Sequence, residues 1–216
     1  MKNNLYSKMF MWMFVGLLIT FLVGYYVSTN ENMIYNIFAT KFYWIIYIAE
    51  IVTVIVLSVR ILKMSKNGAI FGFLLYSFLS GLTFSSIFIT FKMSSIIFIF
   101  LITALVFLIF ALIGYFTKID LTKLGTILFM GLIGILIAAI INIFVQSQTF
   151  DLILVIIGII VFIGYIAYDI NKVKRLEGQI DEDKLSIIGA LELYLDFINL
   201  FIRLLQLFGK SRDDRN

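Results

Sequence analysis

Seven apolar runs in this chain are long enough to cross a lipid bilayer, and they constrain its fold more than any other feature. A hydrocarbon core of about 30 Å requires a helix of about 20 residues. Each run therefore predicts a transmembrane helix, and the chain is expected to be an all-α polytopic membrane protein. The expected spans lie near residues 9–28, 42–62, 68–91, 94–117, 122–145, 149–171 and 184–208.

The composition leaves no room for a soluble domain beside these spans. Hydrophobic residues make up 62% of the chain and charged residues 14%, against about 25% charged in soluble domains. We therefore expect one integral membrane domain over residues 1–216. Cysteine and histidine are absent, which excludes disulfides, thiolate metal sites and cysteine nucleophiles. A response to pH near neutrality would have to come from carboxylates or lysines whose pKa values are shifted.

The basic residues are spread over the loops, so the net charge of +4 does not indicate nucleic-acid binding. Their distribution places the N-terminus in the cytoplasm, because cytoplasmic loops carry the excess of Lys and Arg. The tail residues Lys210, Arg212 and Arg215 oppose this bias, so the side of the C-terminus stays open. The internal loops of the opposite side carry Lys41 and Lys92. The side of the N-terminus carries Lys2, Lys8, Arg60, Lys63, Lys66, Lys118, Lys123, Lys172, Lys174, Arg175 and Lys184.

The last apolar run is interrupted by a polar stripe formed by Glu192, Asp196, Asn199 and Arg203. Their spacings of 4, 3 and 4 place them within about 60° of one another on a helix. Such a stripe must face something other than lipid, and we interpret it as the wall of an ion pathway. The part played by Arg203 stays open, because a position near the end of the run also allows snorkelling.

The other ionisable residues within the spans are Glu50, Arg60 and Asp169. If Asp169 meets Asp196, the two carboxylates cannot both ionise cheaply in a low dielectric, and they would share one proton. Loss of that proton would push the two helices apart, and the ionised pair would suit transient Ca²⁺ binding. Contact is left open, because straight helices would place the two residues at depths that differ by about 9 Å.

Three segments give the chain a resemblance to the Bax-inhibitor family, the proteins that carry the transmembrane Bax inhibitor motif. They are TKIDLTKLG at 117–125, the stretch 162–172 that includes Tyr168-Asp169, and ELYLDFINLFIRLL at 192–205. The similar region covers roughly 68–208. The resemblance implies seven helices, with the last helix central between two three-helix layers. It departs from the family at Ser80-Gly81, which no proline follows.

The same resemblance implies a pH-sensitive calcium leak. It assigns Asp169 and Asp196 as the proton-sharing pair, Arg60 as a latch for Asp169, and Glu50 as an acid in the ion pathway. The stripe adds Glu192 and Asn199 to that pathway. We expect no cofactor, with Ca²⁺ as the permeant ion, and the bilayer and calcium ions as the partners. The high content of Ile, Asn, Lys and Phe favours a bacterial plasma membrane.

Two other functions compete with the calcium leak. An intramembrane aspartyl protease would need a Gly-x-Gly-Asp motif and a Pro-Ala-Leu motif, but Asp196 follows Tyr194-Leu195 and the chain has no proline. We therefore expect no enzymatic activity. The alternative is a regulatory membrane protein that binds a membrane protease or another partner without transport. The acidic segment 181–183 offers no partner surface and is expected to be solvated.

Overall fold

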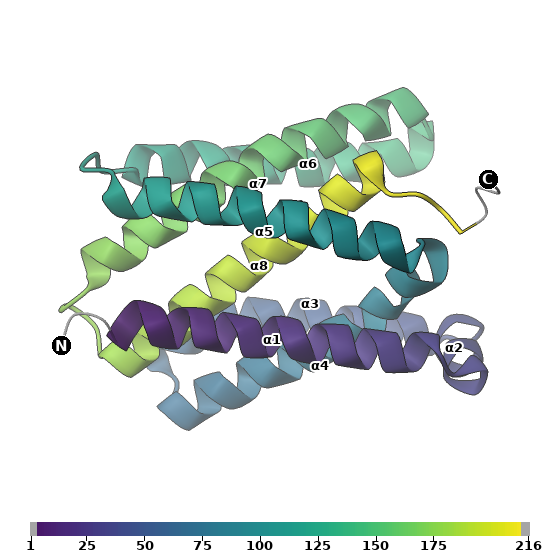
Figure 1. The fold of residues 1–216 in the computed structure, drawn as a ribbon, viewed down its shortest axis with the longest axis horizontal. Helices are drawn as coiled ribbons and strands as arrows, with labels where there is room; N and C mark the ends of the chain where they lie inside the picture. Colours follow the sequence, from purple (N-terminus) through teal and green to yellow (C-terminus); the bar gives the residue numbers. More distant parts are fainter. Residues whose placement is uncertain (1–3, 213–216) are drawn as a thin grey trace. The chain divides into compact units, whose positions relative to one another are not determined.

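A computed structural model describes residues 4–212 of the protein. Seven of its helices are long and apolar enough to cross a membrane (Figure 1), which confirms the all-α fold and the number of spans. Lys2 and Arg215, which entered the charge comparison, lie outside the described residues. The seven helices are α1 (Asn4–Ser28), α3 (Phe42–Arg60, continued by the 3-10 turn η1, Ile61–Lys63), α4 (Lys66–Thr90), α5 (Met93–Phe116), α6 (Thr122–Val145), α7 (Gln148–Leu176) and α8 (Glu182–Phe208).

Two features of these helices were not expected from the sequence. A short helix, α2 (Glu31–Phe38), follows α1, and the side chain of Asn30 caps it by accepting from the Met33 amide at 3.1 Å. Its eight residues are too few to span a bilayer, so a search for long apolar runs passes over it. In addition, α7 continues to Leu176, five residues beyond the expected end. Lys174 and Arg175 favour this extension because cations stabilise the last turn of a helix.

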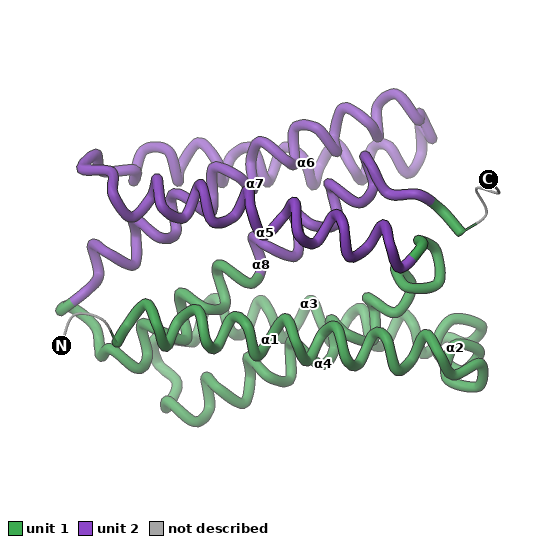
Figure 2. The backbone as a smooth tube through the Cα atoms, viewed as in Figure 1, with its two compact units in different colours: residues 1–92, 178–194, 211–216 green, residues 93–177, 195–210 purple. Residues whose placement is uncertain are grey.

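The chain forms two compact units, shown in different colours in Figure 2. Unit 1 contains α1 to α4, α8 as far as Tyr194, and the tail from Ser211; unit 2 contains α5 to α7 and the chain from Leu195 to Lys210. Each unit thus has three long helices beside its part of α8. Of the 18 most apolar consecutive residues of α8, 78% are buried, whereas the corresponding share is at most 39% in any other span. The expected single domain over residues 1–216 stays a prediction.

Small residues bring α1 and α4 close together in unit 1. A Cβ atom added at Gly16 would lie 2.6 Å from the Phe73 ring, and one added at Gly24 would lie 3.0 Å from the carbonyl oxygen of Gly81. Since residues later in α1 contact residues later in α4, the two helices run parallel. Close backbone approach of this kind is how helices associate in a bilayer, where apolar surface alone gives no preference for protein over lipid.

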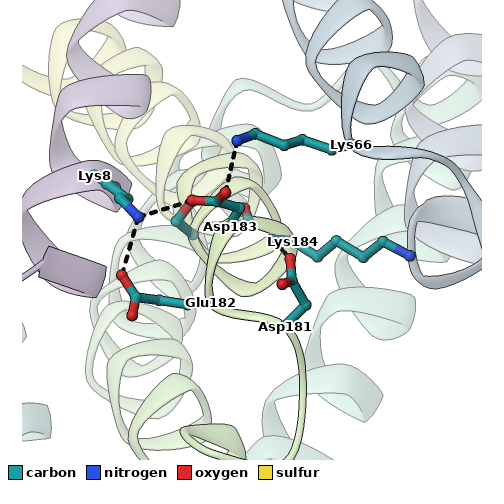
Figure 3. Close-up of polar contacts among 7 residues, drawn as sticks. Lys8, Lys66, Asp181, Glu182, Asp183 and Lys184 are labelled. Carbon is teal, nitrogen blue, oxygen red and sulfur yellow. Dashed lines mark hydrogen bonds and ion pairs between the residues drawn. The ribbon is translucent and has the colours of Figure 1, made fainter.

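An ionic cluster ties the start of α8 to the starts of α1 and α4 (Figure 3). The Asp183 carboxylate lies 2.8 Å from the Lys8 ammonium and 2.6 Å from the Lys66 ammonium, and Lys8 also reaches Glu182 at 3.1 Å. We call these four residues the charge clamp. Segment 181–183 is solvated as expected, with Asp181 and Glu182 exposed, but the pairing of Glu182 and Asp183 with lysines distant in the sequence was not predicted.

The end of α8 is tied to the end of α4. The Arg212 amide donates to the carbonyl oxygen of Thr90 at 2.9 Å, and Ser211 forms an antiparallel bridge with Phe91. Because the start of α8 lies beside Lys66 and its tail beside Thr90, α8 runs parallel to α4. Ser211 and Arg212 therefore lie at the opposite end of unit 1 from the start of α1, and the side of the membrane on which the C-terminus lies stays a prediction.

In unit 2, two glycines let α5 and α6 approach α7 on either side of one turn. A Cβ atom at Gly114 of α5 would lie 2.3 Å from the carbonyl oxygen of Ala167, and one at Gly125 of α6 would lie 2.3 Å from the Tyr168 ring. Residues 167 and 168 immediately precede Asp169. The position of that aspartate is therefore fixed by tight packing from two neighbouring helices.

The charge clamp gives a stability prediction. Asp183→Asn removes the charge of the shared carboxylate and should lower stability by about 1 kcal/mol, since exposed pairs contribute little individually. In detergent at low salt we expect the apparent Tm to fall by about 2–4 °C, and the loss to shrink at high salt because ions screen the pairs. Glu177→Gln, at an exposed carboxylate, is the control. Equal melting temperatures for both variants at low salt would contradict the clamp.

The packing of α6 against α7 gives a second prediction. Both the variant and its matched control lie on α6. Gly125→Ala must displace the Tyr168 ring and should cost about 1–3 kcal/mol by overpacking. Gly134→Ala meets nothing within 4 Å and should be neutral or stabilise the helix by up to about 1 kcal/mol. Thermal unfolding of the two purified variants measures the difference. A Gly125→Ala protein as stable as Gly134→Ala would contradict the packing.

The course of α8 gives a third prediction, which single cysteines can test because the native chain has none. Cysteines at exposed Thr40 and Lys210 should react with a membrane-impermeant maleimide from one side of the membrane, and a cysteine at Ser7 from the other. With the N-terminus in the cytoplasm, intact cells label the first two only. A cysteine at Lys210 that labels like the one at Ser7 would mean that α8 does not cross.

Candidate functional site

The two aspartates of the predicted pair belong to the same unit. Asp169 lies on α7 with 6% of its surface exposed, and Asp196 lies on α8 with 4% exposed. Carboxylates are seldom buried this deeply unless they carry out a function or have partners. The structure therefore places both residues in the interior of unit 2.

Tyr165 relates the two aspartates in space. It lies one turn before Asp169 on α7, and its hydroxyl is within electrostatic range of both Asp169 and Asp196. Lys172 and Tyr168 act on the same hydroxyl, so five polar side chains gather around this part of α7. Direct contact of the two carboxylates stays a prediction.

The end of α7 is held by the segment that joins α5 to α6. The Asn171 side chain accepts from the Leu121 amide and donates to the carbonyl oxygen of Ile119, both at 3.2 Å, and Asn171 is buried. Sequence reasoning gave Asn171 no part, because an asparagine near the end of an apolar run is typical of an interface. Its two bonds instead fix the turn that carries Asp169 against the 117–125 segment.

Asp120 in the same segment is a carboxylate that cannot act as a sensor near neutral pH. The hydroxyl and the amide of Thr122 donate to it at 2.6 and 2.9 Å, and Arg175 lies 3.0 Å away, which together lower the pKa of Asp120. Because the pKa is lowered, the hydrogen bonds and the ion pair to Asp120 stabilise the folded protein above about pH 4. This stabilisation is lost as the pH falls further. Asp120 therefore stays ionised wherever the buried pair would titrate.

Glu50 lies in a polar site of its own in unit 1. The hydroxyls of Ser80 and Thr83 on α4 donate to its two carboxylate oxygens at 2.6 and 2.9 Å, and Glu50 is half-buried. The sequence identified Glu50 as an intramembrane acid but not its partners, which lie 30 and 33 residues further along the chain. A carboxylate with two hydroxyls offers hard oxygen ligands of the kind that Ca²⁺ prefers.

The predicted polar stripe is only partly buried. Asp196 is buried, while Glu192, Asn199 and Arg203 are half-buried, and the expectation that the stripe faces something other than lipid stays a prediction. The Asn199 amide donates to the carbonyl oxygen of Leu195 on its own helix at 2.8 Å. Arg203 lies over α7, where a Cβ atom at Gly158 would be 3.0 Å from its Nε, so the bare glycine backbone makes room for the guanidinium.

Arg60, the predicted latch, is the last residue of α3 and is exposed. It belongs to unit 1 and Asp169 belongs to unit 2, and the latch stays a prediction. Within residues 4–212, no three His, Cys, Asp or Glu side chains come together as a metal-ion cluster. Transient calcium binding by Asp169 and Asp196, which involves only two carboxylates, also stays a prediction.

Comparison with known proteins covers nearly the whole chain. Residues 2–213 match the family described as "Inhibitor of apoptosis-promoting Bax1". "Inner membrane protein YbhL" of Escherichia coli (strain K12) is 43% identical over 213 residues, which cover 95% of this chain and 91% of that protein. A protein of Borreliella burgdorferi is 38% identical over 219 residues, which cover 99% of this chain and 94% of that protein.

A protein of Rickettsia prowazekii is 35% identical over 210 residues, which cover 95% of this chain and 89% of that protein. The family match over residues 2–213 spans α7 and α8, and it also extends over α1 and α3, which lie outside the region 68–208 of the resemblance seen in the sequence. The chain belongs to the Bax-inhibitor family.

Proposed function

We propose that the protein is a pH-sensitive cation leak of a bacterial inner membrane, with Ca²⁺ as the permeant ion and Asp169 and Asp196 as the gate. The observation that carries the proposal is the burial of both carboxylates in one unit, within electrostatic range of the same tyrosine hydroxyl. The inner-membrane location is supported by the seven apolar helices and by the similarity to YbhL. The N-terminus is proposed to be cytoplasmic.

The gate works through the cost of two charges in a low dielectric. When the pair holds one proton, the carboxylates share it and α7 stays against α8. When the pH rises and the proton leaves, the two negative charges repel and the helices separate. The charge then present is also what draws a divalent cation, since ionised carboxylates are strong ligands for Ca²⁺. Proton loss thus opens the gate and provides a cation site in a single step.

Glu50, Glu192 and Asn199 are proposed to line the ion pathway. Glu50 contributes a carboxylate whose Ser80 and Thr83 donors can turn their oxygens toward a passing cation. Arg60 is proposed to act as a latch by pairing with Asp169. Lipid would reject these side chains if they had no aqueous or polar surroundings, and a cation pathway gives all of them one common use.

Flux measurements in proteoliposomes test the proposal. Wild-type protein should pass Ca²⁺ at a rate that changes at least about threefold between about pH 5 and about pH 8, as a group that titrates in this interval requires. Asp169→Asn and Asp196→Asn should each remove that response, because an amide cannot carry the shared charge. Asp151→Asn, at an exposed position of α7, is the control and should behave like wild type.

Two results would contradict the proposal. The first is a pH response that persists in both asparagine variants, which would move the sensor to another group. The second is a wild-type protein without flux in vesicles that retain an internal calcium indicator. The second result would favour the regulatory alternative, in which the protein binds a membrane partner without transport.

A further inference from the structure

Arg203 contributes a positive charge to unit 2, on the part of α8 that belongs to that unit, and its side chain is half-buried. Among residues 4–212, no hydrogen bond and no ion pair joins its guanidinium to another group. The carboxylate that acts on it through space is that of Asp151, which is exposed, so water screens most of this effect. A guanidinium stays charged at every physiological pH. The described part of the chain therefore leaves the charge of Arg203 unpaired.

The guanidinium lies deep in the expected span and not at its end. A Cβ atom at Gly158 of α7 would lie 3.0 Å from Nε of Arg203 and 3.3 Å from its Cζ. Gly158 is about 3 Å along the helix from residue 160, the midpoint of the apolar run 149–171. In addition, helical side chains lean toward the N-terminus of their helix, which directs Arg203 away from the nearer end of α8. Snorkelling to the interface therefore does not account for Arg203.

Arg203 lies between the aspartate pair and the exposed start of α7. Asp151, Gly158 and Tyr165 share one face of α7, because each follows the last by seven residues, about two turns or 10.5 Å. Tyr165 is within electrostatic range of Asp196, and Arg203 lies over Gly158. Arg203 also follows Asp196 by seven residues on α8, as in two antiparallel helices. Along the helices, the positive charge is thus about 10 Å from Asp196 and about 10 Å from Asp151.

A fixed positive charge beside an ion pathway raises the energy of every cation that passes it. This Coulomb energy is proportional to the charge of the passing ion, so the added barrier is twice as high for Ca²⁺ as for K⁺. Rates depend exponentially on the height of a barrier. Removal of the fixed charge should therefore raise the Ca²⁺ rate by the square of the factor that applies to K⁺. A change in the width of the pathway has no reason to follow this relation.

We propose that Arg203 is an electrostatic barrier in the ion pathway, placed between the exposed start of α7 and the aspartate pair, that slows divalent cations more than monovalent ones. The proposal rests on the proposed function, since it gives the same pathway a discrimination by ion charge. Arg203 is thus a specificity-determining residue, whereas Asp169 and Asp196 form the gate. The barrier persists when the gate is open, so it limits the protein to a slow leak.

Paired flux measurements in proteoliposomes test the barrier. Ca²⁺ and K⁺ fluxes are measured separately at about pH 8, where the proposed gate is open, with a proton ionophore that dissipates the membrane potential. Arg203→Met removes the charge and keeps a long unbranched side chain. It should raise the K⁺ flux about threefold and the Ca²⁺ flux about ninefold. Arg203→Lys keeps a positive charge and should raise neither flux by more than about twofold.

A second neutral variant and a matched control separate the charge from the shape of the side chain. Arg203→Gln should raise the two fluxes in the same ratio as Arg203→Met, because both remove the same charge. Lys118→Gln removes one positive charge from an exposed position between α5 and α6, where water and salt screen it. Its fluxes should equal those of wild type.

Thermal unfolding gives a readout that does not depend on flux. An unpaired charge is costly within a span, so Arg203→Met and Arg203→Gln should have melting temperatures at least as high as that of wild type. A structural arginine that joins α7 to α8 would give lower melting temperatures instead. Failure of both neutral variants to fold would likewise give Arg203 a structural role and overturn the barrier.

The outcomes separate the barrier from the proposed function. Fluxes that rise equally for both ions, that do not rise, or that rise as much in Lys118→Gln overturn the barrier and leave the gate intact. A rise ordered by ion charge, in a protein whose pH response survives Asp169→Asn and Asp196→Asn, supports the barrier and removes the gate. If neither wild type nor Arg203→Met passes either ion, the leak and the barrier are both wrong.

Discussion

A polar side chain within a bilayer must be satisfied by the protein, and this requirement determines where α8 can lie. The helix carries Glu192, Asp196, Asn199 and Arg203 on one face, each costly to expose to hydrocarbon. It is also the most shielded of the seven spans. Apolar helices have no such need, and α6 accordingly leaves most of its surface open to lipid. The polar content of one helix thus decides which helix the others surround.

Small residues make that burial possible. Association of helices in lipid depends on close packing, since a leucine gains little by exchanging lipid for protein. Gly16 and Gly24 bring α1 against α4, and Gly114 and Gly125 bring α5 and α6 against α7. The second pair of glycines acts directly beside Asp169. The same backbone contacts that build the unit therefore also hold a titratable group at a fixed position.

The parts of the fold that the sequence predicted are those that depend on local pattern. Apolar runs located all seven spans within a few residues, and helical spacing identified the stripe of α8. The partners of these residues were not predictable in this way. The hydroxyls of Thr20 and Tyr194 lie 2.6 Å apart although the two residues are separated by 174 positions in the sequence, and Asn171 bonds to a segment about 50 residues earlier. Serines and threonines in an apolar run carry no signal of their own, because the backbone of the same helix can satisfy their hydroxyls.

Sharing α8 between the two units has a consequence for how the protein is made. The helix follows the other six spans in the chain, so it is the last of the seven to leave the ribosome. Each unit waits for its part of the same helix, and neither can complete its interior alone. The most buried span, which both units share, thus becomes available only at the end of synthesis. The order of the chain makes insertion of α8 the committing step of biogenesis.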